Sequence, residues 1–403
     1  MSKNLLIKNT ISKNYFKNNL YLGDKIRLNK IIKNIFNRLD DNKNNLHILS
    51  KKLDLQLNQR ILKKFSKYKS VIVLGMGGSI LGSQAIYNFL KEKINKDFLF
   101  FDNLDQEKIE KIKKNINLKK NLFLIISKSG NTLETLINSN LFQDDINNKN
   151  TIIITEKKTN LLNTFAKKKK ILHINHKDYI GGRFSVLSEV GMVPAYFMNL
   201  KIKHFRKYLL DLFKSKKNKL LIDSVVKLSH VYNLKKINSI IFLNYAPELN
   251  SFLYWCQQLM AESLGKSGKG ILPVVSQVPR DHHSLLQLYL DGPKDKLFYI
   301  FSSNLEKKMK IKKNIFGRTF GFIKNKELSK VREAQKKALL QVLKNKNIPY
   351  REFKISRKNE EVLGELFSYF ILETILVGEM IGINPYDQPA VEEVKILTKK
   401  HLS

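Results

Sequence analysis

One short segment concentrates hydroxyl groups beside an ammonium group. The segment 127–135, SKSGNTLET, follows the apolar run LFLII and has a glycine at position 130. The hydroxyl groups belong to Ser127, Ser129 and Thr132, and the ammonium group belongs to Lys128. Helix capping with Glu134 would use one hydroxyl and is the alternative interpretation. Three hydroxyls and a cation suit the terminal oxygens of a phosphomonoester better, so we predict a phosphate-binding turn between a strand and a helix.

A second turn of the same kind comes earlier, in VIVLGMGGSILG at 71–82. An apolar strand, a glycine turn and a helix start present backbone N–H groups to an anion, here with Ser79 directly after Gly78. A dinucleotide site is an alternative, because Asp102 follows at about the distance of a ribose-binding acid. The dinucleotide fingerprint is G-x-G-x-x-G, however, and Gly82 comes two residues too late to be its third glycine. A tight turn without a ligand would explain the glycines but not the hydroxyl.

Two charged residues stand in unusual surroundings. Arg183 follows two glycines in a chain whose default cation is lysine, which indicates that a guanidinium is needed there. Glu262 ends an apolar helical run and precedes the glycines of MAESLGKSGKG, which favours a cleft over a solvated surface. Gln258 lies one helical turn before Glu262 and shares its face.

Composition limits the remaining possibilities. The net charge is +38 at pH 7, but lysine, asparagine and isoleucine are all abundant, and a biased genome accounts for that charge without a nucleic-acid partner. The N-terminus has no signal-peptide pattern, and the long apolar stretch 366–383 is interrupted by Glu373 and Glu379. The single cysteine excludes an internal disulfide. We therefore expect a cytoplasmic protein with no nucleic-acid partner and no membrane span, and a buried helix at 366–383.

The order of elements predicts an α/β protein built from two similar units. Short β-branched runs alternate with helix-length amphipathic segments, which is typical of parallel sheets covered by helices. We expect one domain at 1–200, with a helical lead-in, and a second at 201–403, closed by C-terminal helices. The expected strands are 70–74, 98–101, 122–126, 151–154, 171–174, 239–244, 274–278, 296–301 and 351–355. The expected closing helices are 326–344, 359–381 and 388–400.

Five motifs together resemble the glucose-6-phosphate isomerase family. They are GMGGSILG, SKSGNTLET, GGRFSVLSEVG, MAESLGKSGKG and NPYDQPAVEEVK, and they span about residues 71–400. The resemblance implies two sugar-isomerase domains, each a mainly parallel sheet flanked by helices, in a homodimer. It implies reversible isomerisation of glucose 6-phosphate and fructose 6-phosphate in glycolysis and gluconeogenesis, by ring opening and a cis-enediol. It requires no cofactor, and the histidines form no metal-ligand spacing, so we expect no metal.

The resemblance also implies a role for each matched residue. Glu262 would be the base that moves a proton between C1 and C2, and Arg183 would stabilise the enediolate oxygens. His283 would open the sugar ring from across the dimer interface, with Lys395 assisting at the ring oxygen. His282 is the rival to His283, since adjacent residues on a helix cannot both face the sugar. The implied substrate-binding residues are Gly78, Ser79, Ser127, Lys128, Ser129, Thr132, Gly182, Gln258 and Gln388.

Departures from the family pattern leave the substrate range open. Gly130 and Asn131 replace bulkier or hydroxyl residues, and Ala390 stands where glycine is common. A dual phosphoglucose/phosphomannose isomerase is therefore one alternative. A non-catalytic sugar-phosphate-binding regulator is the other, but such a protein has no need for Glu262, His283 and Lys395 together.

Overall fold

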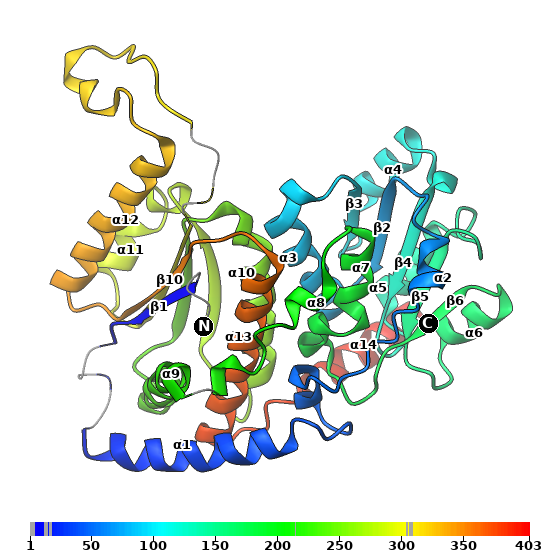
Figure 1. Cartoon of the computed structure of the whole chain (residues 1–403), viewed down its shortest axis with the longest axis horizontal. Helices are drawn as coiled ribbons and strands as arrows, with labels where there is room; N and C mark the ends of the chain where they lie inside the picture. The colour runs from blue at the N-terminus through cyan, green and yellow to red at the C-terminus, as the bar shows by residue number, and fades with distance from the viewer. Residues whose placement is uncertain (1–4, 12–14, 16–17, 214, 304, 306–308) are drawn as a thin grey trace.

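The first unit is a parallel sheet between two layers of helices (Figure 1). The computed structural model describes residues 5–11, 15, 18–213, 215–303, 305 and 309–403. In this sheet the strand order is β3-β2-β4-β5-β6, and every neighbouring pair is parallel. The strands are β2 (Ser70–Gly75), β3 (Asp97–Phe101), β4 (Asn121–Ile126), β5 (Thr151–Thr155) and β6 (Leu172–Asn175). β4 and β5 are buried along their whole length, as expected for a central pair covered on both faces.

Helices connect successive strands of this sheet and cover it. They are α2 (Gln59–Lys63), α3 (Leu81–Leu90), α4 (Gln106–Asn115), α5 (Leu133–Leu141), α6 (Leu161–Lys168) and α7 (Glu189–Phe197). Short polar residues set where they begin: the Asp105 carboxylate accepts from the Lys108 N–H at the start of α4, and Asn160 does the same for Asn163 at the start of α6. These starts place the connecting turns at the carboxyl edge of the sheet.

The second unit contains a sheet of order β1-β10-β9-β7-β8. Its strands are β1 (Leu5–Asn9), β7 (Ser239–Asn244), β8 (Leu272–Gln277), β9 (Lys296–Ser303) and β10 (Tyr350–Ile355). All pairs are parallel except β1 with β10. The α/β prediction with two mainly parallel sheets is confirmed. We expected a helical lead-in, but its first described element is the edge strand β1 of the second sheet. Helix α1 (Asn18–Arg38) follows and packs on α9 (Ser215–Leu234) and α13 (Glu360–Ile381).

Two long helices occupy the centre of the molecule. α10 (Asn250–Leu264) packs on α3 of the first unit and on α13 (Glu360–Ile381) of the second, so it joins the two halves. Trp255 of α10 stacks edge-on against Phe367 of α13, with ring centroids 4.8 Å apart. α13 is buried along nearly its full length, as predicted for the apolar stretch 366–383. The other helices are α8 (Ile202–Phe205), α9 (Ser215–Leu234), α11 (Leu286–Asp291), α12 (Leu328–Asn345) and α14 (Glu392–Leu402).

Two segments of the chain have little packing against the rest of the molecule. The segment 309–327 (yellow in Figure 1) projects from the second unit beyond α12. It exposes Ile315, Phe316 and Phe322. Helix α14 buries none of its residues. Within the described parts of the chain, no helix has the length and apolar character needed to cross a bilayer.

Candidate active site

The two glycine-containing turns lie side by side at one edge of the first sheet. β2 and β4 are parallel neighbours, and Gly75 at the end of β2 is paired in register with Ile126 at the end of β4. The turn after β2 forms the short helix η3 (Gly77–Ser79), and the turn after β4 holds the predicted phosphate-binding residues. Parallel strands thus bring together two segments that are about fifty residues apart in sequence.

The turn after β4 has the hydroxyl cluster that the sequence predicts. The Ser127 and Thr132 hydroxyl oxygens are 2.9 Å apart, and Ser129 Oγ lies 3.5 Å from Thr132 Oγ1. Ser127 is buried, whereas Ser129 is exposed. Gly130 has a φ of +66°, and a Cβ at this position would lie 1.9 Å from Oδ1 of Asn160. Only glycine therefore closes this turn so tightly.

Lys128 supplies the positive charge of this turn. Its Nζ lies 3.8 Å from Oε1 of Glu156, which is buried at the end of β5. Desolvation lowers the pKa of Lys128, and the Glu156 carboxylate opposes that shift. Glu156 also pairs with Lys158. The carboxylate therefore holds two cations at the carboxyl edge, where a phosphate would bind.

The first glycine motif packs against the segment that contains Arg183. A Cβ on Gly78 would lie 2.2 Å from the carbonyl carbon of Gly182, and Ser185 Oγ donates to the Gly182 carbonyl at 2.7 Å. Contact between η3 and η6 (Gly182–Leu187) accounts for Gly78 without a dinucleotide. Asp102, the expected ribose ligand in that alternative, accepts a hydrogen bond of 2.7 Å from Gln84 Nε2. Ser79 is buried next to these glycines.

Arg183 is the centre of the polar network. Its side chain is 3% exposed, and its three nitrogens donate five hydrogen bonds. The acceptors are Ser263 Oγ at 2.8 Å, Glu262 Oε2 at 3.2 Å, Gln388 Oε1 at 3.1 Å, and the carbonyls of Pro385 at 2.7 Å and Asp387 at 3.0 Å. Burial lowers the pKa of Arg183, and the Glu262 charge opposes this. The network fixes the guanidinium plane.

Glu262 lies on α10 between two hydrogen-bond donors. Gln258 Nε2 donates to Glu262 Oε1 at 2.9 Å, and Arg183 donates to Oε2. The carboxylate side chain remains 31% exposed, so a ligand can reach it. Gly77 has a φ of +50°, and a Cβ there would lie 2.7 Å from Gln258 Nε2. The η3 turn beside the phosphate-binding turn therefore also touches the side chain that orients Glu262.

The structure does not bring the two remaining predicted catalytic residues to this network. His283 follows η9 (Arg280–His282); it is exposed and its ring makes no hydrogen bond with any described residue. His282 instead contacts Tyr245, with Nε2 3.1 Å from the hydroxyl, and burial lowers its pKa. Lys395 lies on the exposed helix α14 and pairs with Glu392 at 2.6 Å.

Several site residues were not predicted from the sequence. Ser263 accepts from Arg183, Glu156 faces Lys128, and the carbonyls of Pro385 and Asp387 complete the guanidinium shell. A hydroxyl directly after Glu262 was a usable signal for Ser263. Backbone carbonyls carry no sequence signal. The described residues hold no group of three or more histidine, cysteine, aspartate or glutamate side chains that could bind a metal.

Comparisons with known proteins identify the family to which this chain belongs. The family model for phosphoglucose isomerase matches residues 33–403. A glucose-6-phosphate isomerase of Methanocaldococcus jannaschii is 34% identical over 83% of this chain and 84% of its own, and one of Campylobacter jejuni is 33% identical over 83% and 86%. A crystal structure of a glucose-6-phosphate isomerase from Chlamydia trachomatis aligns with a TM-score of 0.78 at 18% identity, over 100% of this chain and 89% of its own. That structural likeness shows the fold alone. Because the family model matches most of the chain, this protein belongs to the phosphoglucose isomerase family.

Proposed function

We propose that this chain interconverts glucose 6-phosphate and fructose 6-phosphate. The observation that carries the proposal is the contact between one accessible carboxylate, Glu262, and one buried guanidinium, Arg183, next to a turn of hydroxyls. Such a site has a base, a fixed cation for a developing oxyanion and an anchor for phosphate. The named relatives at 33% and 34% identity support the same substrate pair.

The turn after β4 would bind the phosphate and so place C1 and C2 near Glu262. The carboxylate takes the C2 proton of the open-chain aldose, the C1–C2 bond gains double-bond character, and negative charge develops on O1. Arg183 stabilises that charge, since its guanidinium is already oriented by Ser263 and two carbonyls. A proton passes from O2 to O1, and Glu262 returns its proton to C1 to give the ketose.

Ring opening would use residues that a second copy of the chain completes. In the proposed homodimer His283 acts in the site of the other copy, and Lys395 acts at the ring oxygen. The ring of His283, which is exposed and has no hydrogen bond to any described residue, supports this assignment, as does α14, which has no buried residue in the single chain. The apolar side chains of the projecting segment 309–327 supply further surface for dimer contact. Glycolysis in the cytoplasm is the proposed setting.

A coupled assay for glucose 6-phosphate formed from fructose 6-phosphate tests this function. We expect turnover that EDTA leaves unchanged, because neither the proposed base nor the proposed cation is a metal. Binding of the sugar phosphate without turnover would contradict the proposal and favour a non-catalytic regulator. Loss of activity with EDTA, restored by a divalent cation, would contradict the mechanism.

A further inference from the structure

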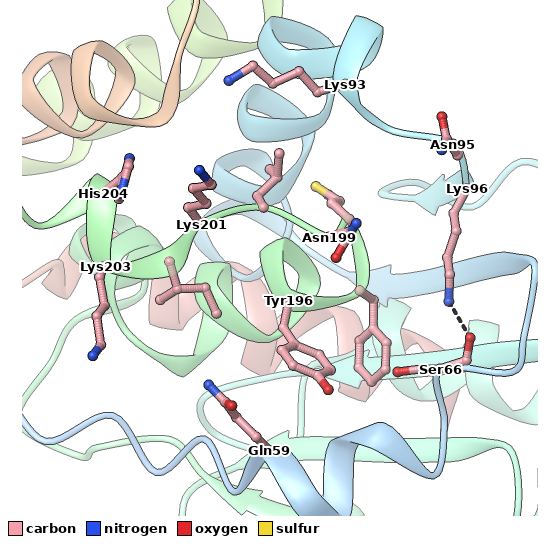
Figure 2. A pocket seen from close by; sticks show the side chains of 14 residues that line it. Gln59, Ser66, Lys93, Asn95, Lys96, Tyr196, Asn199, Lys201, Lys203 and His204 are labelled. Atoms are coloured by element: carbon pink, nitrogen blue, oxygen red, sulfur yellow. Dashed lines mark hydrogen bonds between the residues drawn. The ribbon is translucent and has the colours of Figure 1, made fainter.

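A cavity of about 660 Å³ opens at the opposite edge of the first sheet from the active site. Ser66, which lines it, precedes β2, and Asn95 and Lys96 precede β3, whereas the active-site turns follow the carboxyl ends of the strands. A six-residue strand such as β2 spans about 20 Å. Figure 2 shows the cavity between the end of α3, the end of α7 and the segment around α8. It is a separate site.

Cations line this cavity, and no carboxylate does. The lining includes Lys93, Lys96, Lys201, Lys203 and His204 but no aspartate or glutamate. Two of these residues have acidic neighbours: Lys93 pairs with Glu360 at 2.8 Å, and His204 Nδ1 lies 3.5 Å from Glu361. No carboxylate among the described residues forms an ion pair with the side chains of the other three lysines, although Glu360 Oε1 accepts a hydrogen bond of 3.4 Å from the backbone N–H of Lys201. The cavity therefore has an excess of uncompensated positive charge.

Lys96 is the partly buried lysine of this lining, and its ammonium lies 5.9 Å from the centroid of the Phe197 ring. Its Nζ donates to the carbonyl oxygen of Ser66 at 2.8 Å (dashed line, Figure 2). Desolvation lowers its pKa, and no carboxylate offsets that effect. A bound anion would form an ion pair with this ammonium. Phosphate oxygens suit this role, because lysine is a common phosphate ligand in proteins.

The other walls of the cavity provide an aromatic surface and amides. Tyr196 is half-buried and lies edge-on to Phe197, with ring centroids 5.3 Å apart. Gln59, Asn95 and Asn199 add side-chain amides that can both donate and accept. An aromatic face with nearby amides suits a nucleobase, and the volume falls in the range of about 300–1,000 Å³ that is typical of small-molecule sites. A sugar phosphate alone would leave the aromatic wall unused.

We propose that this cavity binds a nucleoside polyphosphate, with the phosphates along the lysine-lined walls and the base against Tyr196. This cavity is distinct from the proposed sugar-phosphate site, and the proposal does not rest on the proposed function. Since α7 begins two residues after η6, one nine-residue helix connects the wall containing Tyr196 to the segment containing Arg183.

Calorimetric titration with ATP tests the proposal. The full chain would be saturated with fructose 6-phosphate, so that the active site is closed to ATP, and titrated at 0.15 M salt to screen nonspecific attraction. We expect one ATP per chain. The double variant Lys96→Gln with Lys201→Gln should weaken ATP binding at least about tenfold, as expected for lost charge-assisted contacts. The control Lys111→Gln with Lys119→Gln removes two exposed lysines elsewhere and should change the affinity less than about twofold.

A second variant separates the base from the phosphates. Tyr196→Leu should weaken ATP binding but leave binding of inorganic tripolyphosphate unchanged, and ATP should bind more tightly than tripolyphosphate. Equal affinities for the two ligands would overturn the nucleoside assignment. Competition between ATP and fructose 6-phosphate would place ATP in the active site. Equal weakening of ATP binding by the pocket variant and the control variant would mean that ATP responds only to the net charge of the protein. Either result would overturn the proposal.

Discussion

Nη1 of Arg183 lies 3.2 Å from Oε2 of Glu262, although the two residues are 79 positions apart in sequence. Arg183 comes from the segment that closes the first sheet, and Glu262 comes from the helix that joins both halves. The contact therefore exists only when the two units are packed together. This contact holds the proposed base, Glu262, beside the guanidinium that would stabilise the enediolate formed after proton removal.

Glu262→Gln should abolish isomerisation while leaving sugar-phosphate binding nearly intact. The amide keeps the size of the carboxylate and can still contact Gln258 and Arg183, but it cannot accept a proton from carbon. Loss of a general base costs roughly a hundred- to ten-thousand-fold in kcat. The coupled assay gives the rate, and calorimetry with fructose 6-phosphate gives the affinity. Glu107→Gln, an exposed change on α4, is the matched control, and near-normal turnover in Glu262→Gln would remove this residue from the mechanism.

Ser129→Ala combined with Thr132→Ala should raise KM for the phosphorylated sugar by at least about tenfold. Each hydroxyl lost from a charged ligand costs roughly 1.5 to 3 kcal/mol. kcat should fall much less, because the reacting carbons stay near Glu262. Steady-state kinetics with fructose 6-phosphate measure both constants. An unchanged KM would mean that the phosphate lies elsewhere, with the η3 turn as the next candidate.

Mixing two inactive variants tests whether His283 acts in the other copy. Homodimers of Glu262→Ala and of His283→Ala should each be severely impaired. After refolding together in equal amounts, about half of the dimers are mixed, and each mixed dimer has one site with both residues intact. Recovered activity should approach about a quarter of the wild-type level. If mixed dimers form without recovering activity, His283 serves its own chain.

Acid should destabilise the protein through His176. This residue is 1% exposed, and burial lowers its pKa from 6.5 to about 4. The unfolded chain binds the proton more readily within that window, so the free energy of unfolding falls as the pH drops from 6.5 towards 4. The loss attributable to His176 reaches about 3 kcal/mol near pH 4.

Denaturant unfolding at a fixed protein concentration measures this effect. His176→Gln should flatten the pH dependence between pH 6.5 and 4, whereas His401→Gln, on the exposed last turn of α14, should keep the wild-type dependence. Identical slopes for His176→Gln and the wild type would show that the buried imidazole is not responsible.

Local patterns in the sequence predicted every strand except β1, and they drew attention to polar residues that the structure brings close together. β-branched runs such as TIIIT predicted the buried strand β5, and the hydroxyls around Gly130 predicted a turn in which Ser127 and Thr132 do meet. Arg183 stood out because the chain otherwise uses lysine, and it is the residue with the most side-chain contacts in the site.

Long-range pairing could not be predicted from local patterns. β1 joins the second sheet at β10, about 345 residues away, because an edge strand takes its partner from the tertiary arrangement. The same limit applies to Glu156, whose approach to Lys128 depends on β5 lying next to β4. Gly78 suggested phosphate or dinucleotide chemistry, but its close contact with Gly182 is a packing constraint that no one-dimensional motif expresses.

The most direct test of the account follows the hydrogen on C2. Glucose 6-phosphate labelled with deuterium at C2 would be converted in ordinary water, and the fructose 6-phosphate formed would be analysed for deuterium at C1. If Glu262 takes the label as a proton, part of it exchanges with water before its return, so the product should contain less than one deuterium at C1 per molecule. Glu262→Gln should form product at least about a hundredfold more slowly. Quantitative retention of deuterium at C1, together with near-normal turnover of Glu262→Gln, would indicate direct hydride transfer and would contradict the proposed proton transfer by Glu262.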